Sequence, residues 1–392
     1  MDVFNVDADD IYSDDLILYS VLYSSVTVVF AMAVLSRFLT NEFRFGFRSF
    51  LSLVVLFLGE PLCQFLIKGP GGLLTFSAGC LLVYSVLPAS HLPVGNKAVL
   101  VTGCDSGFGH ALVKKLDSIG MRVFAGFLDK DGLGATTIRN QCSERVVQLQ
   151  LDVTNVKEID AVVEYVRQAV GEEGLWGLVN NAGVWFFSEL EMTSETLLQK
   201  VMNVNLFGPV RLTRALLPLI RQAKGRITNV SSLMGHLTME GNGAYSMSKH
   251  ALVAYTNTLR QEMKKWKVLV SMIEPTGFYT DNIKEHVLRR RQEEIWDTLD
   301  EDSKNTYGRE YIDKIYNSII IGAARYPVDL TPVIRAMRSS LLSKRPRERY
   351  PCGTGAETLM TLYPILPVWL ADKVSNALGI IPRDVRPASL IQ

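Results

Sequence analysis

A glycine-rich stretch, VTGCDSGFGHAL at residues 101–112, constrains the fold more than any other part of the chain. Its glycines Gly103, Gly107 and Gly109 have the spacing G-x-x-x-G-x-G. A short apolar run precedes them, as a buried parallel strand would, and a helical pattern follows over residues 110–119. Glycine lets the backbone approach a ligand closely, and the N–H groups at a helix N-terminus bind pyrophosphate. The order strand, glycine loop, helix therefore predicts a dinucleotide-binding site.

Similar apolar runs recur along the next part of the chain. The sequences MRVFAGF, VVQLQLDV, LWGLVNNAG, GRITNVSS and KVLVSMIEP each have the length and composition of a buried strand. Helical stretches separate them, and strands that alternate with helices form a parallel sheet covered on both faces. We therefore predict an α/β fold, a Rossmann-like doubly wound parallel sheet, for a catalytic domain over residues 96–283.

The N-terminal region differs in character. Hydrophobic residues make up 48% of the whole chain, which is high for a soluble enzyme. Residues 16–35 carry no charge and are long enough to cross a hydrocarbon core of about 30 Å as a helix. A second apolar run, residues 50–67, is interrupted by a glutamate and a proline, and a third, residues 69–90, is again uncharged. We predict a membrane region over residues 1–95 with two or three transmembrane helices.

A cleaved signal peptide followed by buried core helices is the alternative for this region. Such a signal begins with basic residues, whereas this chain begins with the acidic residues Asp2, Asp7, Asp9, Asp10, Asp14 and Asp15. Positive residues near span ends mark the cytoplasmic side, and Arg37, Arg44 and Arg48 lie between the first two runs. Three spans therefore place the catalytic domain in the cytoplasm, with the endoplasmic reticulum as the expected membrane and a mitochondrial membrane as the alternative. If Glu60 and Pro61 make the second run a re-entrant or surface segment, the domain instead shares the side of the acidic tail.

A tyrosine, a lysine and a serine form a candidate catalytic set. Tyr245 and Lys249 are four residues apart at the start of a helical run, so both lie on one helix face. Ser232 ends the fifth expected strand, at the same edge of the sheet. A tyrosine with its ordinary pKa of about 10 is a poor base at neutral pH, but a nearby ammonium and a positively charged nicotinamide favour the phenolate. Such a tyrosine takes the hydroxyl proton as an alcohol is oxidised. The tyrosine–lysine spacing alone also suits an exposed helix pair, so this prediction depends equally on the serine and the glycine loop.

The end of the second expected strand selects the dinucleotide. An acid there binds the ribose 2′-hydroxyl of NAD, whereas an arginine favours the 2′-phosphate of NADP. Asp129 is the nearest acid, and Lys130 is the only nearby cation, so we predict NAD rather than NADP. The alternative role of Asp129 is a helix N-cap. Asp152 ends the third strand and is expected at the adenine edge, while Asn181 and Gly183 end the fourth strand, where ligands of such sheets bind.

The sequences TGCDSGFG, NNAG, NVN and EPTGFYT, with the serine–tyrosine–lysine set, resemble the classical short-chain dehydrogenase/reductase family over residues 97–283. The hydrophobic N-terminus and the late YGREYI are similar to its membrane-anchored branch of steroid, retinol and hydroxybutyrate dehydrogenases. The resemblance implies that Tyr245 is the acid/base, that Lys249 bonds the nicotinamide ribose and lowers the tyrosine pKa, and that Ser232 positions the substrate oxygen. It implies further that Asn205 holds a water in a proton relay, where the alternative is a helix-bending or capping asparagine.

The same resemblance gives a set of residues expected to bind the cofactor, with Thr280 contacting the nicotinamide carboxamide. They are Gly103, Ser106, Gly107, Phe108, Gly109, Asp129, Asp152, Asn181, Ala182, Gly183, Tyr245, Lys249, Pro275 and Thr280. One departure matters, because Thr276 stands where the family usually has glycine. A side chain there lies beside the nicotinamide pocket, and we expect it to shift the cofactor or trim the substrate site.

Three further features have ordinary explanations. His236 and His250 lie close to the catalytic set but have no role in the family, and we interpret both as structural. The sequence NVS at Asn229 fits a glycosylation sequon, yet it ends a core strand and is expected to stay unmodified.

The alternation of strands and helices ends near Lys284. KEHVLRRRQEEIWDTLDEDSK is a heavily charged helix candidate, interpreted as a solvated face. The end of the chain, including TLMTLYPILPVWLADKVSNALGI, is apolar and broken by prolines. We predict that residues 284–392 form a substrate lid or extension, with a membrane-surface element or plain packing as alternatives.

Charge and cysteine usage narrow the function. The formal net charge is +1, so bulk charge gives no reason to expect nucleic-acid binding. The five cysteines are scattered and contain no CxxC pair, which argues against a disulfide framework or a zinc site. The expected function is the NAD-dependent oxidation of a secondary alcohol on a lipophilic molecule, steroid- or retinoid-like, by a membrane enzyme that is expected to form a homodimer. A short hydroxy acid such as 3-hydroxybutyrate as substrate, and a catalytically silent dinucleotide-binding scaffold, remain alternatives.

Overall fold

The computed structural model describes residues 8–40, 47–67, 69–87, 91–379 and 385–390. The chain divides into two compact units, residues 1–92 with 343–345, and residues 93–342 with 346–392.

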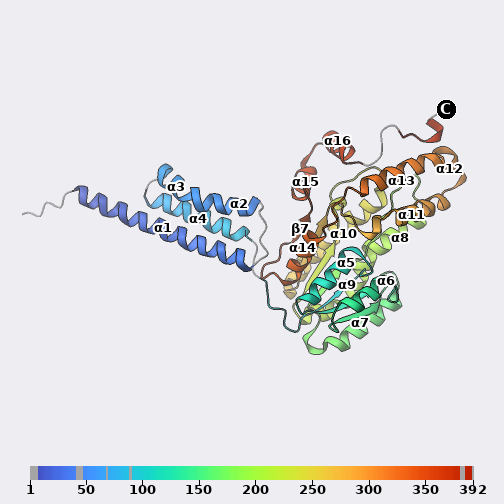
Figure 1. Ribbon diagram of the computed structural model, residues 1–392, viewed down its shortest axis with the longest axis horizontal. Helices are drawn as coiled ribbons and strands as arrows, with labels where there is room; N and C mark the ends of the chain where they lie inside the picture. The colour runs from blue at the N-terminus through green and yellow to red at the C-terminus, as the bar shows by residue number, and fades with distance from the viewer. Residues whose placement is uncertain (1–7, 41–46, 68, 88–90, 380–384, 391–392) are drawn as a thin grey trace, which may run out of the picture. The chain divides into compact units, whose positions relative to one another are not determined.

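The N-terminal unit consists of apolar helices (Figure 1). They are α1 (Ala8–Thr40), α2 (Phe47–Val54), α3 (Glu60–Leu66) and α4 (Pro70–Val86), with a π-helical turn (Val55–Gly59) between α2 and α3. Within α1, the segment Ile17–Ser36 is long and apolar enough to cross a membrane, and only 17% of it is buried in the protein. The second and third apolar runs form shorter helical segments, Phe50–Leu66 and Pro70–Ser85.

Glu60 and Pro61, which interrupt the second run, do not break its helix, because they directly follow the π-helical turn within the continuous helical segment Phe50–Leu66. Proline lacks the N–H that a helix interior uses, and the π-helical turn before Pro61 is an irregularity that accommodates this loss. The Thr27 hydroxyl donates to Glu60 Oε2 at 2.5 Å, and Gln64 Nε2 donates to Glu60 Oε1 at 3.3 Å. Both oxygens of this carboxylate are therefore partnered within the unit. The side chains of the acidic tail and of the three arginines that carry the orientation argument lie outside the described residues, so the orientation stays a prediction.

The second unit is built on a seven-stranded sheet in the order β3-β2-β1-β4-β5-β6-β7, with every neighbouring pair parallel. The strands are β1 (Ala98–Val101), β2 (Arg122–Phe127), β3 (Val146–Gln150), β4 (Gly177–Asn180), β5 (Arg226–Val230), β6 (Leu269–Pro275) and β7 (Arg349–Cys352). The strand order reverses between β1 and β4, and this switch point is where doubly wound sheets bind ligands. The predicted fold class is confirmed.

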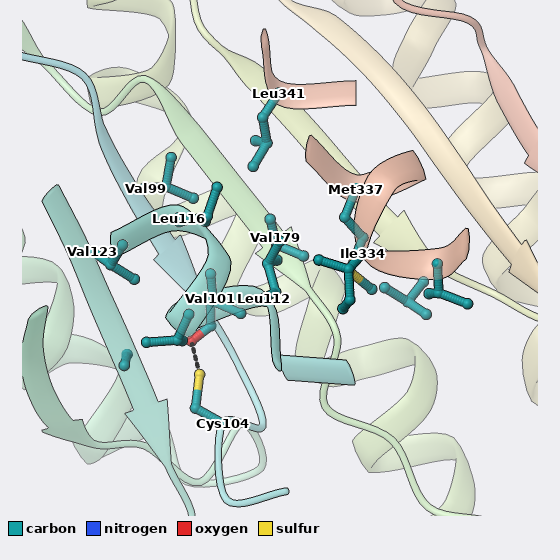
Figure 2. Close-up of a cluster of buried hydrophobic side chains, with 14 of the residues drawn as sticks. Val99, Val101, Cys104, Leu112, Leu116, Val123, Val179, Ile334, Met337 and Leu341 are labelled. Carbon is teal, nitrogen blue, oxygen red and sulfur yellow. Dashed lines mark hydrogen bonds between the residues drawn. The ribbon is translucent and has the colours of Figure 1, made fainter. Parts of the chain in front are cut away.

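Helices cover both faces of the sheet. One face carries α5 (Gly107–Ser118), α6 (Leu133–Gln141) and α14 (Thr331–Leu342), and the other carries α7 (Val156–Val170), α9 (Gly208–Gln222) and α10 (Gly243–Met263). Figure 2 shows part of the first core, where Leu112 and Leu116 of α5 and Met337 of α14 lie among valines of β1, β2 and β4. Strand side chains alternate between the two cores, so the central strands β1, β2, β4, β5 and β6 are buried on both faces, as a continuous apolar run predicts. The edge strands β3 and β7 are less buried.

A further core lies beyond the sheet, where α8 (Glu195–Met202) packs with α11 (Glu285–Thr298), α12 (Glu301–Tyr307) and α13 (Arg309–Ala323). Two short helices near the C-terminus, α15 (Ala356–Leu362) and α16 (Val368–Leu378), follow β7. The prediction of a solvated charged helix at α11 is wrong for one of its faces. Leu288, Arg291, Gln292 and Ile295 of this helix are buried, because the four lie at helical spacing against α13 and its neighbours.

Candidate active site

The glycine loop has the shape that its spacing predicts. Gly103 has a φ of +67°, and a Cβ there would lie 2.8 Å from Ala182 Cα. A Cβ on Gly109 would lie 2.3 Å from the Gly103 carbonyl oxygen. Gly107 has a φ of +59°, and its missing Cβ would face Thr280 at 3.5 Å. Backbone thus takes the place of side chains between β1, β4 and the start of α5, which leaves N–H groups open to a phosphate.

Ser106 and Phe108 of the glycine loop have different positions. Ser106 is the N-cap residue of α5, with extended backbone and no side-chain capping bond. Phe108 lines the cavity described below, and its ring meets Phe278 edge-on with centroids 5.7 Å apart. This aromatic pair joins the glycine loop to the segment that follows β6.

Thr102 ties the ends of β1 and β4 together, and the sequence reasoning did not include it. Its hydroxyl oxygen accepts the N–H groups of Asn181 at 3.0 Å and Ala182 at 2.9 Å. The Asn181 Nδ2 donates in return to the carbonyls of Thr102 at 2.9 Å and Gly103 at 3.1 Å. The threonine directly before the first loop glycine was the available signal, because a hydroxyl at a strand end can hold a neighbouring turn.

Acidic side chains gather at the end of β2. The Asp105 carboxylate accepts the N–H groups of Leu128 at 3.0 Å and Asp129 at 3.1 Å. Asp129 is exposed, and its own carboxylate accepts the N–H of Asp131 at 3.1 Å. The alternative role of Asp129 as a helix N-cap is wrong, because α6 begins after Gly132. Asp105 was a further omission of the sequence reasoning, because its partners follow β2, more than twenty residues further along the chain.

Asp152 follows β3, and its carboxylate accepts hydrogen bonds within a local turn. Its Oδ1 accepts the N–H and the hydroxyl of Thr154, each at 2.8 Å. The turn fixes the direction of the carboxylate at the same end of the sheet as Asp129.

Tyr245, Lys249 and Ser232 come together as predicted. Both α10 residues lie in its first turns, and the Lys249 Nζ stands 5.5 Å from the centroid of the Tyr245 ring. Lys249 is buried, and its Nζ donates to the Val230 carbonyl at 2.9 Å. The Ser232 hydroxyl lies beside the Tyr245 phenol and lowers its pKa. Ser232 lies two residues beyond β5, at the N-cap of a short 3-10 turn (Leu233–Gly235).

Asn205 connects the catalytic helix to the end of β4. It lies in a π-helical turn (Asn203–Phe207), and its side chain pairs with the Val184 backbone, accepting the N–H at 2.8 Å and donating to the carbonyl at 2.9 Å. Its Nδ2 also donates to Ser248 Oγ at 3.0 Å. The capping alternative for Asn205 is therefore wrong, because its bonds run to other segments. Gly183 lies between the side chains of Asn205 and Lys249, since a Cβ on it would be 3.4 Å from Asn205 Oδ1 and 3.7 Å from Lys249 Nζ.

Burial sets the proton affinities of the two α10 residues. It raises the pKa of Tyr245 to about 12, an effect that the Ser232 hydrogen bond partly opposes. It lowers the pKa of Lys249 to about 8, because a charged ammonium is costly away from water. The phenol is therefore protonated at neutral pH in the protein alone, and lowering its pKa requires added positive charge at the site.

These residues open onto one cavity of about 410 Å³, within the range usual for small-molecule sites. Its polar lining includes Asn181, Ser232, Asn242, Tyr245, Lys249 and Thr280. Its apolar lining comes from distant segments and includes Trp185, Met234, Phe278, Ile319, Leu359 and Leu378. Asn242, a further residue that the sequence reasoning missed, accepts the Trp185 indole N–H at 2.7 Å and so fixes one wall.

Thr276 packs against the turn that follows β7. Its N–H donates to the Cys352 carbonyl at 2.9 Å, and a Cβ on Gly353 would lie 2.0 Å from Thr276 Oγ1. Gly353 has a φ of +112°, so this turn requires glycine for both space and conformation. Pro275 and Thr276 both line the cavity, which places the unusual side chain at its wall.

Comparisons with known proteins agree with this geometry. The family model for short chain dehydrogenase matches residues 97–291. Estradiol 17-beta-dehydrogenase 2 of Rattus norvegicus is 38% identical over 322 residues, which are 81% of this chain and 84% of that protein. The chain belongs to the short-chain dehydrogenase family. It is therefore an oxidoreductase that acts on hydroxyl or keto groups with a nicotinamide dinucleotide.

Two further relatives of this short-chain dehydrogenase extend the comparison. The 11-beta-hydroxysteroid dehydrogenase type 2 of Bos taurus is 34% identical over 351 residues, 89% of this chain and 87% of that protein. A crystal structure of a short chain dehydrogenase/reductase from Burkholderia phymatum in complex with NAD has a TM-score of 0.53 and 25% identity, and covers 63% of this chain and 85% of that one. The resemblance to the steroid dehydrogenase branch, predicted from the sequence, is confirmed.

Proposed function

We propose that this short-chain dehydrogenase oxidises a secondary alcohol on a lipophilic molecule, steroid- or retinoid-like, with NAD. The observation that carries the proposal is the convergence of Ser232, Tyr245 and Lys249, with Asn205 bonded behind them, on a cavity with mainly apolar walls. The substrates named for the two similar steroid dehydrogenases support this class.

Each polar side chain has a distinct role in the proposed reaction. Tyr245 takes the proton of the substrate hydroxyl, and Ser232, which lies beside that phenol, orients the substrate oxygen. A bound dinucleotide supplies the two-electron acceptor for the alcohol carbon. Lys249 holds the nicotinamide ribose and adds positive charge beside the phenol, which opposes the effect of burial on its pKa. Asn205 holds the Val184 backbone and a water through which the released proton leaves the site.

The residues present fit a dinucleotide, because three glycines expose backbone at the start of α5: a Cβ on Gly103 or Gly109 would collide with the chain, and Gly107 has a positive φ. We propose that Gly103, Ser106, Gly107, Phe108 and Gly109 hold the pyrophosphate side. Asp129 and Asp152 would bind the adenosine side, and Asn181, Ala182, Gly183, Pro275 and Thr280 would surround the nicotinamide side together with the two α10 residues.

A preference for NAD over NADP follows from the acids at the end of β2. Asp129 is exposed there, and Asp105 lies within hydrogen-bond distance of the Asp129 N–H. Two carboxylates at this edge repel a 2′-phosphate, whereas a 2′-hydroxyl can donate to Asp129.

The cavity lining favours a lipophilic substrate over a hydroxy acid. In the part of the chain that the structure describes, Lys249 is the only charged residue lining the cavity, and its Nζ already donates to the Val230 carbonyl. A substrate carboxylate would therefore be buried without a cationic partner, which is costly. A steroid or retinoid skeleton instead meets Trp185, Phe278 and Leu378.

We propose the C-terminal segment as the lid of this cavity. Leu359 of α15 and Leu378 of α16 line it, and Met360 packs with Leu233 and Leu237 beside the catalytic serine. We therefore propose residues 284–392 as the lid or extension, beside a membrane region at residues 1–95 and a catalytic domain at residues 96–283.

The N-terminal unit is proposed as a membrane anchor, in the endoplasmic reticulum with the catalytic domain in the cytoplasm. One segment, Ile17–Ser36, has the length and composition of a span, and Glu60 has partners within the helices. Protease digestion of sealed microsomes tests the orientation. Digestion of the catalytic domain supports the cytoplasmic side, and full protection would place the domain in the lumen.

A homodimer is proposed from the family resemblance.

The function is tested with the full-length protein in membranes and NAD. The panel holds estradiol, an 11β-hydroxysteroid, retinol and 3-hydroxybutyrate, NADH formation is followed, and Tyr245→Phe membranes are the matched control. We expect oxidation of a lipophilic alcohol by the unmodified protein alone. Oxidation confined to 3-hydroxybutyrate would support the hydroxy-acid alternative, and dinucleotide binding without turnover of any cellular metabolite would support the silent scaffold.

A further inference from the structure

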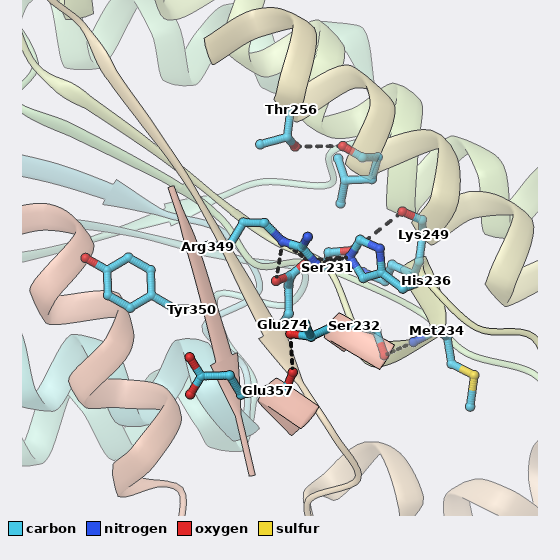
Figure 3. Close-up of polar contacts among 12 residues, drawn as sticks. Ser231, Ser232, Met234, His236, Lys249, Thr256, Glu274, Arg349, Tyr350 and Glu357 are labelled. Atoms are coloured by element: carbon cyan, nitrogen blue, oxygen red, sulfur yellow. Dashed lines mark hydrogen bonds and ion pairs between the residues drawn. The ribbon is translucent and has the colours of Figure 1, made fainter. Parts of the chain in front are cut away.

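The side chains of His236, Glu274 and Arg349 meet one another close to the Ser232 turn (Figure 3). Glu274 of β6 is 0% exposed, and Arg349 of β7 donates to both of its oxygens, from Nε to Oε2 at 3.0 Å and from Nη2 to Oε1 at 2.9 Å. The His236 Nε2 lies 2.5 Å from Glu274 Oε1 and 2.7 Å from Arg349 Nη2. The three side chains form one closed cluster, and a buried carboxylate of this kind needs such partners.

The cluster joins three chain segments that each continue to the cavity. Pro275 and Thr276 follow Glu274 directly and line the cavity, and Thr354 follows Arg349 on the turn after β7 and does the same. His236 directly follows the 3-10 turn that begins at Ser232. A displacement of the cluster therefore reaches both the serine and the nicotinamide side of the site.

The turn from Ser232 to His236 is held at two points. Gly235 packs on α10, because a Cβ there would lie 2.8 Å from Val253 Cγ2 and 3.1 Å from the Lys249 carbonyl oxygen. His236 holds the other end through Glu274 on β6. Within the turn, Ser232 Oγ accepts the Met234 N–H at 3.2 Å, and the Gly235 and His236 N–H groups donate to the carbonyls of Ser232 and Leu233, each at 3.0 Å.

We propose that His236 is a positioning residue for the reaction, which sets the place of the Ser232 hydroxyl by anchoring its turn to the Glu274–Arg349 pair. This inference rests on the proposed function, in which Ser232 orients the substrate oxygen beside the Tyr245 phenol. From the sequence alone, His236 was interpreted as structural; the inference gives it a role in placing the catalytic serine.

The structure separates this role from general stability. Arg349 contacts both Glu274 oxygens, so the carboxylate keeps a bidentate partner when the imidazole is removed. His236→Ala therefore leaves the buried charge compensated and removes one anchor of the serine turn. Arg349→Met leaves the carboxylate without its cation and is expected to unfold the protein, so it is unsuitable as the test.

The first readout needs no substrate. Carbon-13 NMR of full-length protein labelled at tyrosine Cζ reports the hydrogen bond made by Tyr245, with the signal assigned by its loss in Tyr245→Phe. We expect Ser232→Ala and His236→Ala to displace this signal in the same direction, and the double variant to show no further displacement than Ser232→Ala. His250→Ala is the matched control, since His250 is exposed on α10 and its Nδ1 lies 2.9 Å from the Ser246 carbonyl oxygen of its own helix.

The second readout is turnover of the best alcohol of the panel with NAD. We expect His236→Ala to lower kcat about tenfold, the effect of losing one hydrogen bond in a site, with the dissociation constant for NADH unchanged. His236→Gln, whose amide carries both a donor for Glu274 and an acceptor for Arg349, should recover most of the loss for either tautomer of the imidazole. If His236→Ala fails to accumulate as folded protein, His236→Asn, whose amide is too short to reach Glu274, replaces it in both readouts.

An unmoved Tyr245 signal in His236→Ala, or a displacement that adds to that of Ser232→Ala, would overturn the inference. Additivity would mean that the imidazole acts on the phenol independently of the serine. A wild-type protein that oxidises none of the alcohols would count against the proposed function, while the NMR readout would still decide the role of His236.

Discussion

The cofactor half and the substrate half of the cavity depend on the sequence in different ways. The cofactor half consists of the glycine loop and the ends of β1 to β4, and its shape is a backbone shape that short polar side chains hold, as in the Thr102 and Asn181 pairing. The substrate half consists of the Ser232 turn, the ends of β6 and β7, and helices α13, α15 and α16, and its walls are apolar side chains from distant segments. A backbone shape demands glycine at fixed positions, whereas an apolar wall accepts many side chains.

This difference has a consequence for variation between enzymes. The cofactor half tolerates little change, because a Cβ at Gly103 or Gly109 meets the chain itself. The substrate half can be altered one side chain at a time without moving the sheet. Specificity is therefore expected to lie in the segments near the C-terminus.

The largest effect is expected where the halves meet. Tyr245→Phe removes the proton acceptor but no cofactor contact in the glycine loop, so turnover should fall at least about 100-fold. NADH binding, measured by fluorescence titration, should survive. Residual activity above a tenth of wild type would show that another residue is the base.

The pH dependence sharpens the assignment of the base. Because burial raises the pKa of Tyr245 to about 12, the phenolate fraction rises about tenfold per pH unit at neutral pH. The value of kcat/KM for alcohol oxidation should rise with pH between about 6 and 8, by up to tenfold per unit. Above that range the slope should flatten, because the lowered pKa of Lys249, about 8, removes its positive charge there.

Measurements of the reverse reaction provide the control for that profile. Reduction of the ketone uses the protonated phenol, which dominates throughout this range, so its rate should vary little with pH. An oxidation rate independent of pH would contradict the assignment of Tyr245 as base.

Within the cofactor half, Gly103→Ala should weaken dinucleotide binding by tens of fold or more. The new Cβ would lie 2.8 Å from Ala182 Cα and 3.1 Å from its nitrogen, so the loop must move. Gly120→Ala is the matched control, since Gly120 also has a positive φ of +86° but no atom within 4 Å of its Cβ position. That variant should lose about 1–2 kcal/mol of stability and no affinity. Equal losses of affinity would mean that strain alone, and not the collision, explains the effect.

Asp129→Asn removes a negative charge from the end of β2, so the preference for NAD over NADP should fall by about tenfold. The ratio of kcat/KM for NADP to that for NAD should rise, while Asp131→Asn on the same turn should leave it nearly unchanged. A wild-type enzyme that already prefers NADP would show that the prediction from the strand end is wrong.

The smallest effect is expected in the substrate half. Leu378→Ala removes part of the apolar wall and should raise KM for a steroid alcohol severalfold, in keeping with about 1–2 kcal/mol for a leucine that is 41% exposed without ligand and is covered by a substrate in the cavity. The KM for NAD should not change. Trp369→Ala is the matched control, since Trp369 is exposed on the same helix and lies outside the cavity lining. A shared effect of both variants would point to the stability of α16 instead.

The same contrast explains what the sequence could predict. The glycine loop, the six strands β1 to β6 and the Tyr245–Lys249 pair were predictable, because each depends on residues close together in the chain. Strand β7 escaped prediction because it has four residues and contains Pro351, so no apolar run marks it. The Asp105 bonds to the β2 end and the Trp185–Asn242 pair escaped because each joins segments more than twenty residues apart.

Asn229 carries a consequence for how the protein is made. It lies within β5 at 0% exposure, where its Nδ2 donates to Thr256 Oγ1 at 2.9 Å and its Oδ1 accepts from Asn180 at 2.8 Å. A catalytic unit translocated during synthesis would present the unfolded sequon Asn229–Val230–Ser231 to the glycosylation machinery before β5 could form. A glycan attached there could not enter the core, and the chain would be trapped unfolded. Biosynthesis on the cytosolic face of a membrane avoids this fate, so the buried sequon favours the same side as the arginines near the first span.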